Sequence, residues 1–455
     1  MRITSRLRDS RRAGAFVLLL ASASLVIHCS SESESSNDGA QDPLGADAGT
    51  DASVGADASE PSQDAGVADA RPTVPDLQKS DAGPQPVTCA DSTCATALDT
   101  SVGSDAFCAL LQDGTVACWG QNVSGELGRG AAAGTSDSSM PARVVGLANA
   151  ASLHHTCAID TNGATWCWGK GPFLRSTVTA TTTERAPVQL AIPAATKVAF
   201  STNVACALVQ DGVLCWGANA DGQLAVPAFG ASTTKPIGAA TMPVPAGAPL
   251  RDVIVGNASF VLREDGTLWS WGANPPLGRV SSLFPDPYPG QLELAFVSDL
   301  DVEGRNACAV AEGIAYCWGS ANEPYNGLKG DLPLSRALPA VVATPEPVVQ
   351  IATTFDTGVA QLPQRQCAVG VSGAVYCWGN NINGQVGDGT RNYAPVPVKV
   401  AGLPGPVARV KTTPRSTCAL LTSGKIWCWG DNGYGQLGDG RTKETSLVPK
   451  EVALP

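Results

Sequence analysis

Seven Trp-Gly pairs recur along this chain at nearly even spacing, and they limit its fold more than any other feature. Roughly fifty residues separate one pair from the next. The tryptophans of these pairs are Trp119, Trp168, Trp216, Trp271, Trp318, Trp378 and Trp429. A period of this length is typical of a small structural unit that stacks against its neighbours. The sequence therefore predicts seven copies of one unit.

Each unit is predicted to be a small β-sheet that is apolar on both faces. The residue two positions before the repeat Trp shares its face of the strand and is often aromatic, as at Trp166 and Tyr376. A strand that is apolar on both faces has to lie between neighbouring sheets. Seven sheets that close into a ring satisfy this need without exposed ends. We therefore expect an all-β ring in which the tryptophans are packing residues.

Twelve of the fifteen cysteines fall into pairs, and the second member of each pair precedes a repeat Trp. The pairs are Cys108 with Cys118, Cys157 with Cys167, Cys206 with Cys215, Cys308 with Cys317, Cys367 with Cys377, and Cys418 with Cys428. In the remaining repeat both members are replaced together, by Phe260 and Ser270, as expected for partners. Regular pairs in an exported chain indicate disulfides, and no repeat supplies the further ligands of a closed zinc site. Cys89 and Cys94 are placed to form a local bridge at the edge of the domain.

The cysteine spacing predicts how each hairpin turns. A three-residue loop at 112–114 places Cys108 opposite Cys118, within reach of a disulfide. A two-residue Glu312-Gly313 turn restores the same facing pair in the shorter 308–317 segment. For the 206–215 segment we expect a bulge near Gly212.

The N-terminal segment indicates export. Five arginines precede an apolar run from Ala15 to Ile27, which has the length of a signal-peptide core. Cys29 ends that run, as in the cleavage and lipidation site of a bacterial lipoprotein, although His28 stands where a small residue is usual. We therefore expect residues 1–29 to be a lipoprotein-type signal. An ordinary secretory signal and a retained anchor are the alternatives.

Residues 30–88 have the composition of a disordered acidic linker. They are rich in Ser, Asp, Ala, Gly and Pro, and they hold twelve acidic residues, two basic residues and no aromatic residue. Such a segment cannot bury a core. The folded domain is therefore predicted to span 89–455. It has no basic bias, which argues against nucleic acid or anionic lipid as its partner.

The repeats resemble the regulator of chromosome condensation repeat family, whose members form seven-bladed β-propellers. The similarity is clearest in residues 418–440, with their Trp-Gly-x-Asn-x-x-Gly-Gln-Leu-Gly phrase, and is nearly as clear in 367–389 and 108–130. The resemblance implies a propeller that acts through contacts with other proteins. The chain end, 448–455, parallels 140–147. From this we expect 448–455 to pair with the segment after Cys94, so that both termini complete the last unit and clasp the ring.

Loops that depart from the Gly-Gln-Leu-Gly phrase are the candidate binding surface. They carry aromatic residues and an arginine, which on loops over a rigid ring suit protein binding. These candidates are Phe173, Arg175, Phe229, Phe284, Tyr288 and Tyr325. The equally weighted alternative is that they fill gaps between irregular blades.

Three classes of function remain. We expect an envelope-tethered, non-catalytic propeller that binds another protein as a scaffold, receptor or inhibitor. It would be monomeric, located at the outer membrane or cell surface if lipidated, and periplasmic or secreted if not. The alternatives are a hydrolase or lyase that acts on a glycan at the propeller axis, and a structural or adhesive surface protein. The sequence holds no catalytic or phosphate-binding motif, and we expect neither a cofactor nor a metal.

Overall fold

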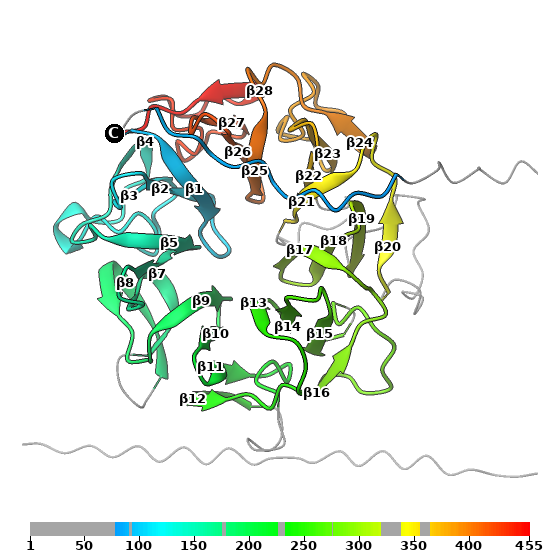
Figure 1. The fold of residues 1–455 in the computed structure, drawn as a ribbon. Coiled ribbons are helices and arrows are strands. Elements are labelled where there is room, and N and C mark those ends of the chain that lie inside the picture. Colours follow the sequence, from blue (N-terminus) through cyan, green and yellow to red (C-terminus); the bar gives the residue numbers. More distant parts are fainter. Residues whose placement is uncertain are drawn as a thin grey trace, which may run out of the picture. The chain divides into compact units, whose positions relative to one another are not determined.

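Each repeat folds into a four-stranded antiparallel sheet, or blade, whose strands follow one another in sequence order (Figure 1). The structure is a computed structural model that describes residues 78–90, 93–174, 179–225, 233–274, 276–319, 338–354 and 365–455. The predicted signal segment, Cys29 and most of the predicted linker lie outside these residues. The seven blades confirm the all-β seven-bladed propeller.

The strands of the first four blades have the following bounds. Blade 1 consists of β1 (Ala95–Thr100), β2 (Ala106–Leu111), β3 (Val116–Gly120) and β4 (Ser138–Arg143), with a short 3-10 helix, η1 (Ala131–Ala133), before β4. Blade 2 consists of β5 (Ala150–His154), β6 (Cys157–Asp160), β7 (Thr165–Leu174) and β8 (Thr179–Gln189). Blade 3 consists of β9 (Ala195–Phe200), β10 (Val204–Val209), β11 (Gly212–Asn219) and β12 (Thr233–Thr241). Blade 4 consists of β13 (Leu250–Val255), β14 (Ala258–Arg263), β15 (Leu268–Gly272) and β16 (Asp286–Gln291).

The last three blades follow the same order. Blade 5 consists of β17 (Val297–Glu303), β18 (Asn306–Ala311), β19 (Ile314–Gly319) and β20 (Ala340–Val342). Blade 6 consists of β21 (Val348–Ala352), β22 (Gln366–Gly370), β23 (Val375–Gly379) and β24 (Ala394–Lys399). Blade 7 consists of β25 (Val407–Thr412), β26 (Ser416–Leu421), β27 (Ile426–Gly430) and β28 (Ser446–Glu451).

The first strand of each blade, the inner strand, faces the axis of the ring, and the fourth is the outer strand (Figure 1). In an antiparallel meander the first and third connections lie at one end of the sheet, and the second lies at the other end. We call the end with the first and third connections the loop face. The other end, with the tight hairpin turns between the second and third strands, is the turn face.

All seven predicted disulfides are present. Cys89 is bonded to Cys94, with their Cα atoms 5.5 Å apart. The six hairpin bridges each join two residues that lie directly opposite in the strand register, with Cα atoms 4.1 Å apart. They connect Cys108 to Cys118, Cys157 to Cys167, Cys206 to Cys215, Cys308 to Cys317, Cys367 to Cys377, and Cys418 to Cys428. Each bridge therefore lies within one blade, as the spacing predicts.

Of the two shorter hairpins, one turns as predicted and the other does not. The Glu312-Gly313 turn is confirmed by the pairing of Ala311 with Ile314. The predicted bulge near Gly212 is wrong. A two-residue turn pairs Val209 with Gly212 directly, so the missing residue is taken from the turn and Cys206 still faces Cys215.

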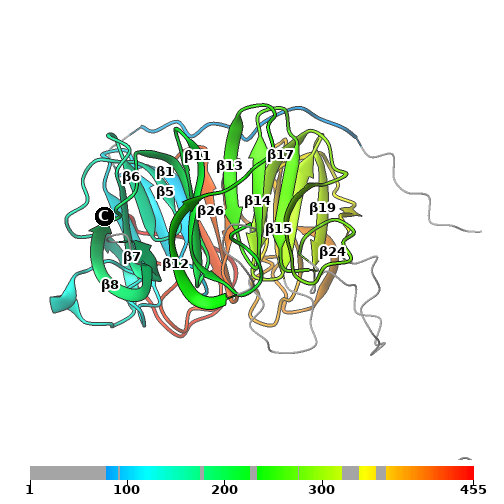
Figure 2. The same ribbon diagram turned by 90° about the horizontal axis from the view of Figure 1, so that it is seen from below.

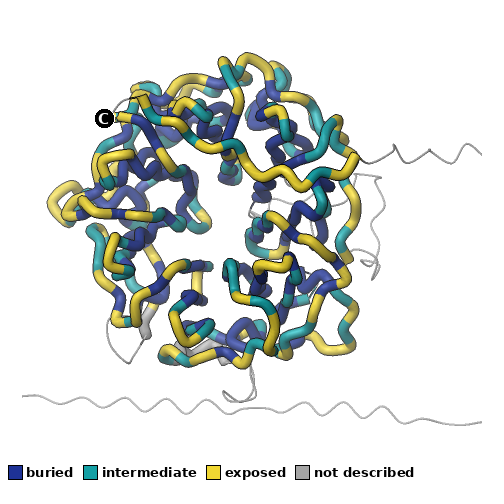
Figure 3. Tube along the Cα trace, viewed as in Figure 1, coloured by how far each residue is buried: buried dark blue, intermediate teal, exposed yellow. Residues whose placement is uncertain are grey.

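The core of the ring lies between blades, because each of its main clusters combines buried residues of two neighbouring blades. Buried residues are frequent along the strands of every blade (Figure 3). The cluster around Trp119, for example, combines Leu98 and Phe107 of blade 1 with Leu420 and Ile426 of blade 7. Six of the seven junctions share one hydrogen bond, from the first N–H of an inner strand to the turn glycine of the preceding blade. The donor and acceptor residues are Ala95 and Gly424, Ala150 and Gly114, Ala195 and Gly163, Val297 and Gly266, Val348 and Gly313, and Val407 and Gly373.

The expected clasp of the two termini is wrong. β28 pairs with β27 and β1 pairs with β2, so every blade is built from one continuous stretch of chain. The likeness of 448–455 to 140–147 arises because both segments begin in outer strands, β28 and β4. The ring closes instead through the ordinary junction, with the Ala95 N–H bonded to the Gly424 carbonyl at 3.0 Å.

Candidate functional site: an exposed apolar loop on blade 4

The regular loops of the loop face are structural. In four of them the Asn of the Trp-Gly-x-Asn phrase accepts a hydrogen bond from the backbone N–H five residues later, which fixes the loop. These pairs are Asn122 and Leu127, Asn219 and Leu224, Asn381 and Val386, and Asn432 and Leu437. The repeated phrase therefore explains how a loop is shaped and leaves binding to the loops that depart from it.

The segment that follows a Trp-Gly pair also anchors the repeat tryptophan of the next blade. Six indole N–H groups donate to a backbone carbonyl of the preceding blade at 2.6 to 3.0 Å. The pairs are Trp119 and Gln436, Trp168 and Glu126, Trp216 and Pro172, Trp271 and Gln223, Trp318 and Pro276, and Trp429 and Gln385. These six tryptophans are almost fully buried, so they are packing residues, as the sequence predicts.

Among the connections that the structure describes in nearly full length, the one between β15 and β16 of blade 4 departs from this scheme. Its centre is an ion pair between Arg279 and Asp286, with Nη1 and Oδ2 2.8 Å apart and side chains only 15% and 6% exposed. Arg279 also donates to the carbonyls of Ser270 and Tyr288. Asp286 accepts from the Ser281 hydroxyl at 2.7 Å and from the Tyr288 N–H at 3.0 Å. The buried pair therefore holds both ends of the loop.

Four large apolar side chains project from this rigid frame into solvent. Val280 is 72% exposed, Leu283 43%, Phe284 82% and Tyr288 53%. We call these four residues the blade-4 apolar loop. Their exposure is costly in water unless a partner covers them, and aromatic anchors on a pre-organised frame are the usual centre of a protein interface.

The predicted binding residues differ in their exposure to solvent. Phe284 and Tyr288 are exposed, as a binding role requires, and that role stays a prediction. Phe173 is only 3% exposed and packs edge-on against Phe200 at 6.0 Å, so the expectation of an exposed loop aromatic is wrong there. It fills the space between blades 2 and 3. Arg175, Phe229 and Tyr325 lie outside the described residues.

Sequence reasoning missed Val280, Leu283 and the ion pair behind them. Scattered apolar residues in a loop carry no periodic signal, and Arg279 and Asp286 are ordinary loop residues in the sequence. The absence of the Gly-Gln-Leu-Gly phrase after Trp271 was the available signal.

The axis of the ring holds a second group of polar residues. The Lys411 ammonium of β25 lies 3.2 Å from Asp99 Oδ1 of β1 and 3.6 Å from Asp301 Oδ1 of β17, so it links blades 7, 1 and 5. His155, the residue after β5, is 3.9 Å from Asp99 and bonds to the Thr100 carbonyl. Convergence of carboxylates on the axis is what a catalytic centre would need.

The protonation states at the axis follow from burial and pairing. Burial opposes ionisation of Asp99, but the Lys411 ammonium, His155 and two backbone hydrogen bonds together outweigh it and hold the pKa of that carboxyl well below its usual range. Burial raises the pKa of Glu303 to about 8, and Asp301 adds to the rise. Burial also lowers the pKa of His154 to about 3. At neutral pH the axis thus contains an ionised Asp99 beside the Lys411 ammonium, a neutral His154 and a protonated Glu303.

This arrangement is that of a structural cluster. Lys411 neutralises the carboxylates that a general base would have to keep free, and its two ion pairs tie three blades together. Within the described ranges no set of His, Cys, Asp or Glu side chains is grouped so that it could hold a metal ion. The same residues include no helix long and apolar enough to span a membrane.

Comparison with known proteins agrees with the repeat pattern. Residues 372–420 match the Regulator of chromosome condensation (RCC1) repeat, and residues 98–126 and 410–436 match a second description of the same repeat. The chain contains RCC1 repeats. These matches lie in blades 1, 6 and 7, where the Gly-Gln-Leu-Gly phrase is intact or nearly so.

Two well-characterised proteins are similar in sequence to parts of this RCC1-repeat chain. The human E3 ubiquitin-protein ligase HERC2 is 29% identical over 201 residues, which are 42% of this chain and 4% of HERC2. The ultraviolet-B receptor UVR8 of Arabidopsis thaliana is 27% identical over 211 residues, which are 45% of this chain and 47% of UVR8. This chain thus spans less than half the length of these relatives.

Solved structures support the fold alone. Human WBSCR16 superposes with a TM-score of 0.59 at 20% identity, covering 75% of this chain and 94% of its own. Prp20p from Saccharomyces cerevisiae superposes with a TM-score of 0.55 at 18% identity, covering 80% and 88%. The superpositions establish a shared propeller architecture. At identities this low they indicate nothing about a shared ligand.

Proposed function

We propose that this RCC1-repeat protein is an exported, non-catalytic binding propeller that recognises another protein through the blade-4 apolar loop. The observation that carries the proposal is the exposure of Val280, Leu283, Phe284 and Tyr288 on a loop held by the buried Arg279–Asp286 pair. Similar propellers support a protein partner in general. The Prp20p structure is described with its binding to Gsp1p and histones, and a further structure has Kap60 bound to yeast RCC1 (Prp20).

We further propose that the protein is tethered to the cell envelope through a lipid on Cys29. The support is the apolar run that ends at Cys29 and the acidic, aromatic-free segment that follows it. Seven disulfides also fit an oxidising compartment outside the cytosol. Thr88, at the end of the predicted linker, donates its N–H to the Thr422 carbonyl in a hairpin turn of blade 7, so the chain meets the ring on its turn face, opposite the loop face that carries the apolar loop.

Variant-controlled capture tests the binding role. The oxidised mature protein is immobilised and exposed to envelope extract and medium proteins of the producing bacterium. A partner that uses the apolar loop should bind the wild type and be lost with Phe284→Ala, since truncation of an interface anchor costs about 2 kcal/mol or more. Ile382→Ala is the matched control, because Ile382 is 53% exposed on a loop of blade 6. A partner retained equally by both variants, or no partner at all, contradicts the proposal.

The tether is tested separately. Intact-mass analysis of the mature protein should show a lipid-modified N-terminal cysteine at Cys29. Cys29→Ala should release the protein from the membrane fraction without changing its unfolding temperature. An unmodified Cys29 would contradict the lipid anchor and leave the binding test unaffected.

A further inference from the structure

The predicted linker does not end where the sequence indicates. Residues 78–88, which we call the strap, lie across the turn face and reach β1 after passing blades 5, 6 and 7 (Figures 1 and 2). The Ser80 N–H donates to the Glu312 carbonyl of blade 5 and the Thr88 N–H to the Thr422 carbonyl of blade 7, both at 2.8 Å. Between them, the Gln85 side chain donates to the Val371 carbonyl of blade 6 at 3.1 Å. The ordered chain therefore begins before residue 89.

The strap shows how the turn face binds an extended peptide. Glu312, Val371 and Thr422 are each the first residue of a hairpin turn, so three blades use the same carbonyl position. At blade 5 a lysine adds to this contact, since Lys79 Nζ lies 2.6 Å from Glu312 Oε2. Lys79 and Ser80 thus bind Glu312 at two points. The Lys79 ammonium pairs with the carboxylate, and the Ser80 N–H donates to the backbone carbonyl.

Blade 4 presents the same acidic turn position. Glu264 is the first turn residue after β14, as Glu312 is after β18. The corresponding residues of the other five blades carry no charge, and they are Gln112, Thr161, Gln210, Val371 and Thr422. The blade-4 turn is one residue longer than that of blade 5, and the additional residue, Asp265, supplies another carboxylate.

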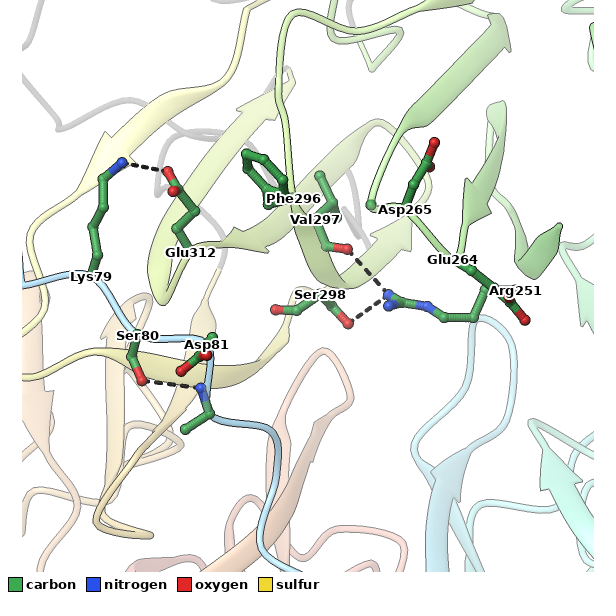
Figure 4. Close-up of a pocket in the computed structure, with 12 residues that line it drawn as sticks. Lys79, Ser80, Asp81, Arg251, Glu264, Asp265, Phe296, Val297, Ser298 and Glu312 are labelled. Carbon is green, nitrogen blue, oxygen red and sulfur yellow. Dashed lines mark hydrogen bonds and ion pairs between the residues drawn. The ribbon is translucent and has the colours of Figure 1, made fainter. Parts of the chain in front are cut away.

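A pocket of about 510 Å³ lies at this second acidic turn (Figure 4). Lys79, Ser80, Asp81 and Ala82 of the strap form one wall, and Arg251, Glu264, Asp265 and Gly266 of blade 4 form the other. Its size suits one long side chain with the adjoining backbone of a peptide. The pocket therefore lies beside the strap, at a turn that resembles the blade-5 turn to which the strap binds.

Phe296 gives this pocket an apolar surface. It is 65% exposed, and its backbone has a φ of 54°, which is unfavourable for a residue other than glycine. The neighbouring turn packs closely here, because a Cβ on Gly266 would lie 2.6 Å from the Phe296 Cα. An exposed aromatic ring held in such a conformation is well placed to cover the methylene stem of a lysine or to stack on its ammonium.

The charges around the pocket favour a cation. The Arg251 guanidinium is directed to the backbone, where it donates to the Val297 and Ser298 carbonyls (Figure 4). Lys79 is paired with Glu312. The carboxylates of Asp81, Glu264 and Asp265 thus outnumber the cations available to balance them.

We propose that this pocket is a second binding site, which takes a lysine-bearing extended peptide segment of another protein. The lysine ammonium binds Glu264, its stem lies on Phe296, and the following N–H bonds to the turn backbone as Ser80 does on blade 5. The site lies on the turn face, away from the blade-4 apolar loop, and does not depend on the proposed function of that loop.

A labelled peptide with the strap sequence, residues 78–88, is a suitable probe because it carries the lysine and the extended form. Fluorescence anisotropy with the full-length oxidised protein at low salt should show saturable binding. Acetylation of the probe lysine should weaken it at least as much as loss of the Glu264 carboxylate. Glu264→Gln and Phe296→Ala should each weaken it by about three- to tenfold, since an exposed ion pair and a surface stacking contact are modest interactions.

Glu293→Gln is the matched control, because Glu293 is an exposed acid close in sequence to Phe296 that does not line the pocket. It should leave the probe affinity unchanged, as should Phe284→Ala on the loop face. The proposal is overturned if the probe shows no saturable binding, if Glu264→Gln has no effect, or if Glu293→Gln weakens binding as much as Glu264→Gln. Unchanged unfolding temperatures of the variants confirm that the ring is intact in each.

Discussion

At the scale of single residues, the last glycine of the Gly-Gln-Leu-Gly phrase is explained by the next blade. Gly387 has a φ of 83°, and a Cβ at this position would lie 2.5 Å from Trp429 Nε1. Gly128, Gly278 and Gly438 meet the tryptophan of the following blade in the same way. Blade 3 has Ala225 at the equivalent position, with a φ of 42°, so the conformation is retained even where the glycine is lost. The glycine therefore serves both the turn and the packing.

Two glycine substitutions separate these contributions. Gly387→Ala should lower the free energy of unfolding by about 2 to 3 kcal/mol, through left-handed backbone strain together with displacement of Trp429. Gly389→Ala should cost only about 1 kcal/mol, because Gly389 also has a positive φ of 86° but meets no atom within 4 Å. Urea unfolding of both variants measures the difference. Equal losses would show that packing against Trp429 contributes nothing.

At the scale of the hairpin, one blade keeps the common strand register without a disulfide. Blade 4 lacks the bridge, and its two positions remain directly opposite, as Phe260 and Ser270. The Ser270 hydroxyl donates to the Leu277 carbonyl at 2.6 Å, and the Phe260 ring packs edge-on against Trp318 at 6.2 Å. The hairpin geometry therefore does not depend on the bridge, which adds stability to a register that the turn already sets.

Removal of one bridge should confirm this role. Cys157→Ala combined with Cys167→Ala should lower the free energy of unfolding by roughly 2 to 3 kcal/mol, since the closed loop is short, and should leave the β-sheet circular dichroism unchanged. Peptide mapping without reduction checks the assignment in the wild type. It should find every described bridge within 89–94 or within a single hairpin, and a bridge between two blades would contradict the structure.

At the scale of the whole molecule, the ring closes by repetition rather than by exchange of strands. Blade 7 meets blade 1 through the Ala95–Gly424 hydrogen bond, the Trp119–Gln436 hydrogen bond and the Lys411–Asp99 ion pair. The first two repeat contacts found at other junctions. Lys411 also pairs with Asp301 of blade 5, so the axis itself connects non-adjacent blades.

The axial cluster predicts a pH dependence of stability. The pKa of Glu303 rises from its ordinary value of 4.5 to about 8 on folding, so between these values the folded protein keeps a proton that the unfolded chain has lost. Stability should therefore fall as pH rises through this window. Asp99 has the opposite effect on stability, because its pKa is lowered on folding. Its contribution to the free energy of unfolding is lost only as the pH falls below its ordinary pKa of 3.8.

Glu303→Gln tests this prediction. The variant should lose less stability than the wild type between about pH 5 and pH 9, by roughly 1 to 2 kcal/mol, because Glu303 is only partly buried. Some slope should remain in the variant, since burial also raises the pKa of Asp299 and of Asp105. Urea unfolding at pH 5, 7 and 9 is the measurement. Parallel pH profiles for the two proteins would show that Glu303 does not titrate in this window.

The sequence by itself determined the number of blades, the hairpin registers and the disulfides. These are set by local relations, namely the repeat period, the alternation of faces along a strand and the length of a turn, and all of them can be counted along the chain. Even the error at Gly212 concerned one turn residue and left the pairing of Cys206 with Cys215 correct.

Only the tertiary structure decided how the ring closes, where the strap lies and which loop residues are exposed. The burial of Phe173 against Phe200 and the exposure of Phe284 come from what neighbouring blades place beside them, which no local pattern records. The Asp99–Lys411–Asp301 cluster joins residues from three blades, and the strap joins Lys79 to Glu312 across more than two hundred residues of chain. Contacts between residues so far apart in sequence depend on the curvature of the closed ring, and therefore on the packing of all seven blades together.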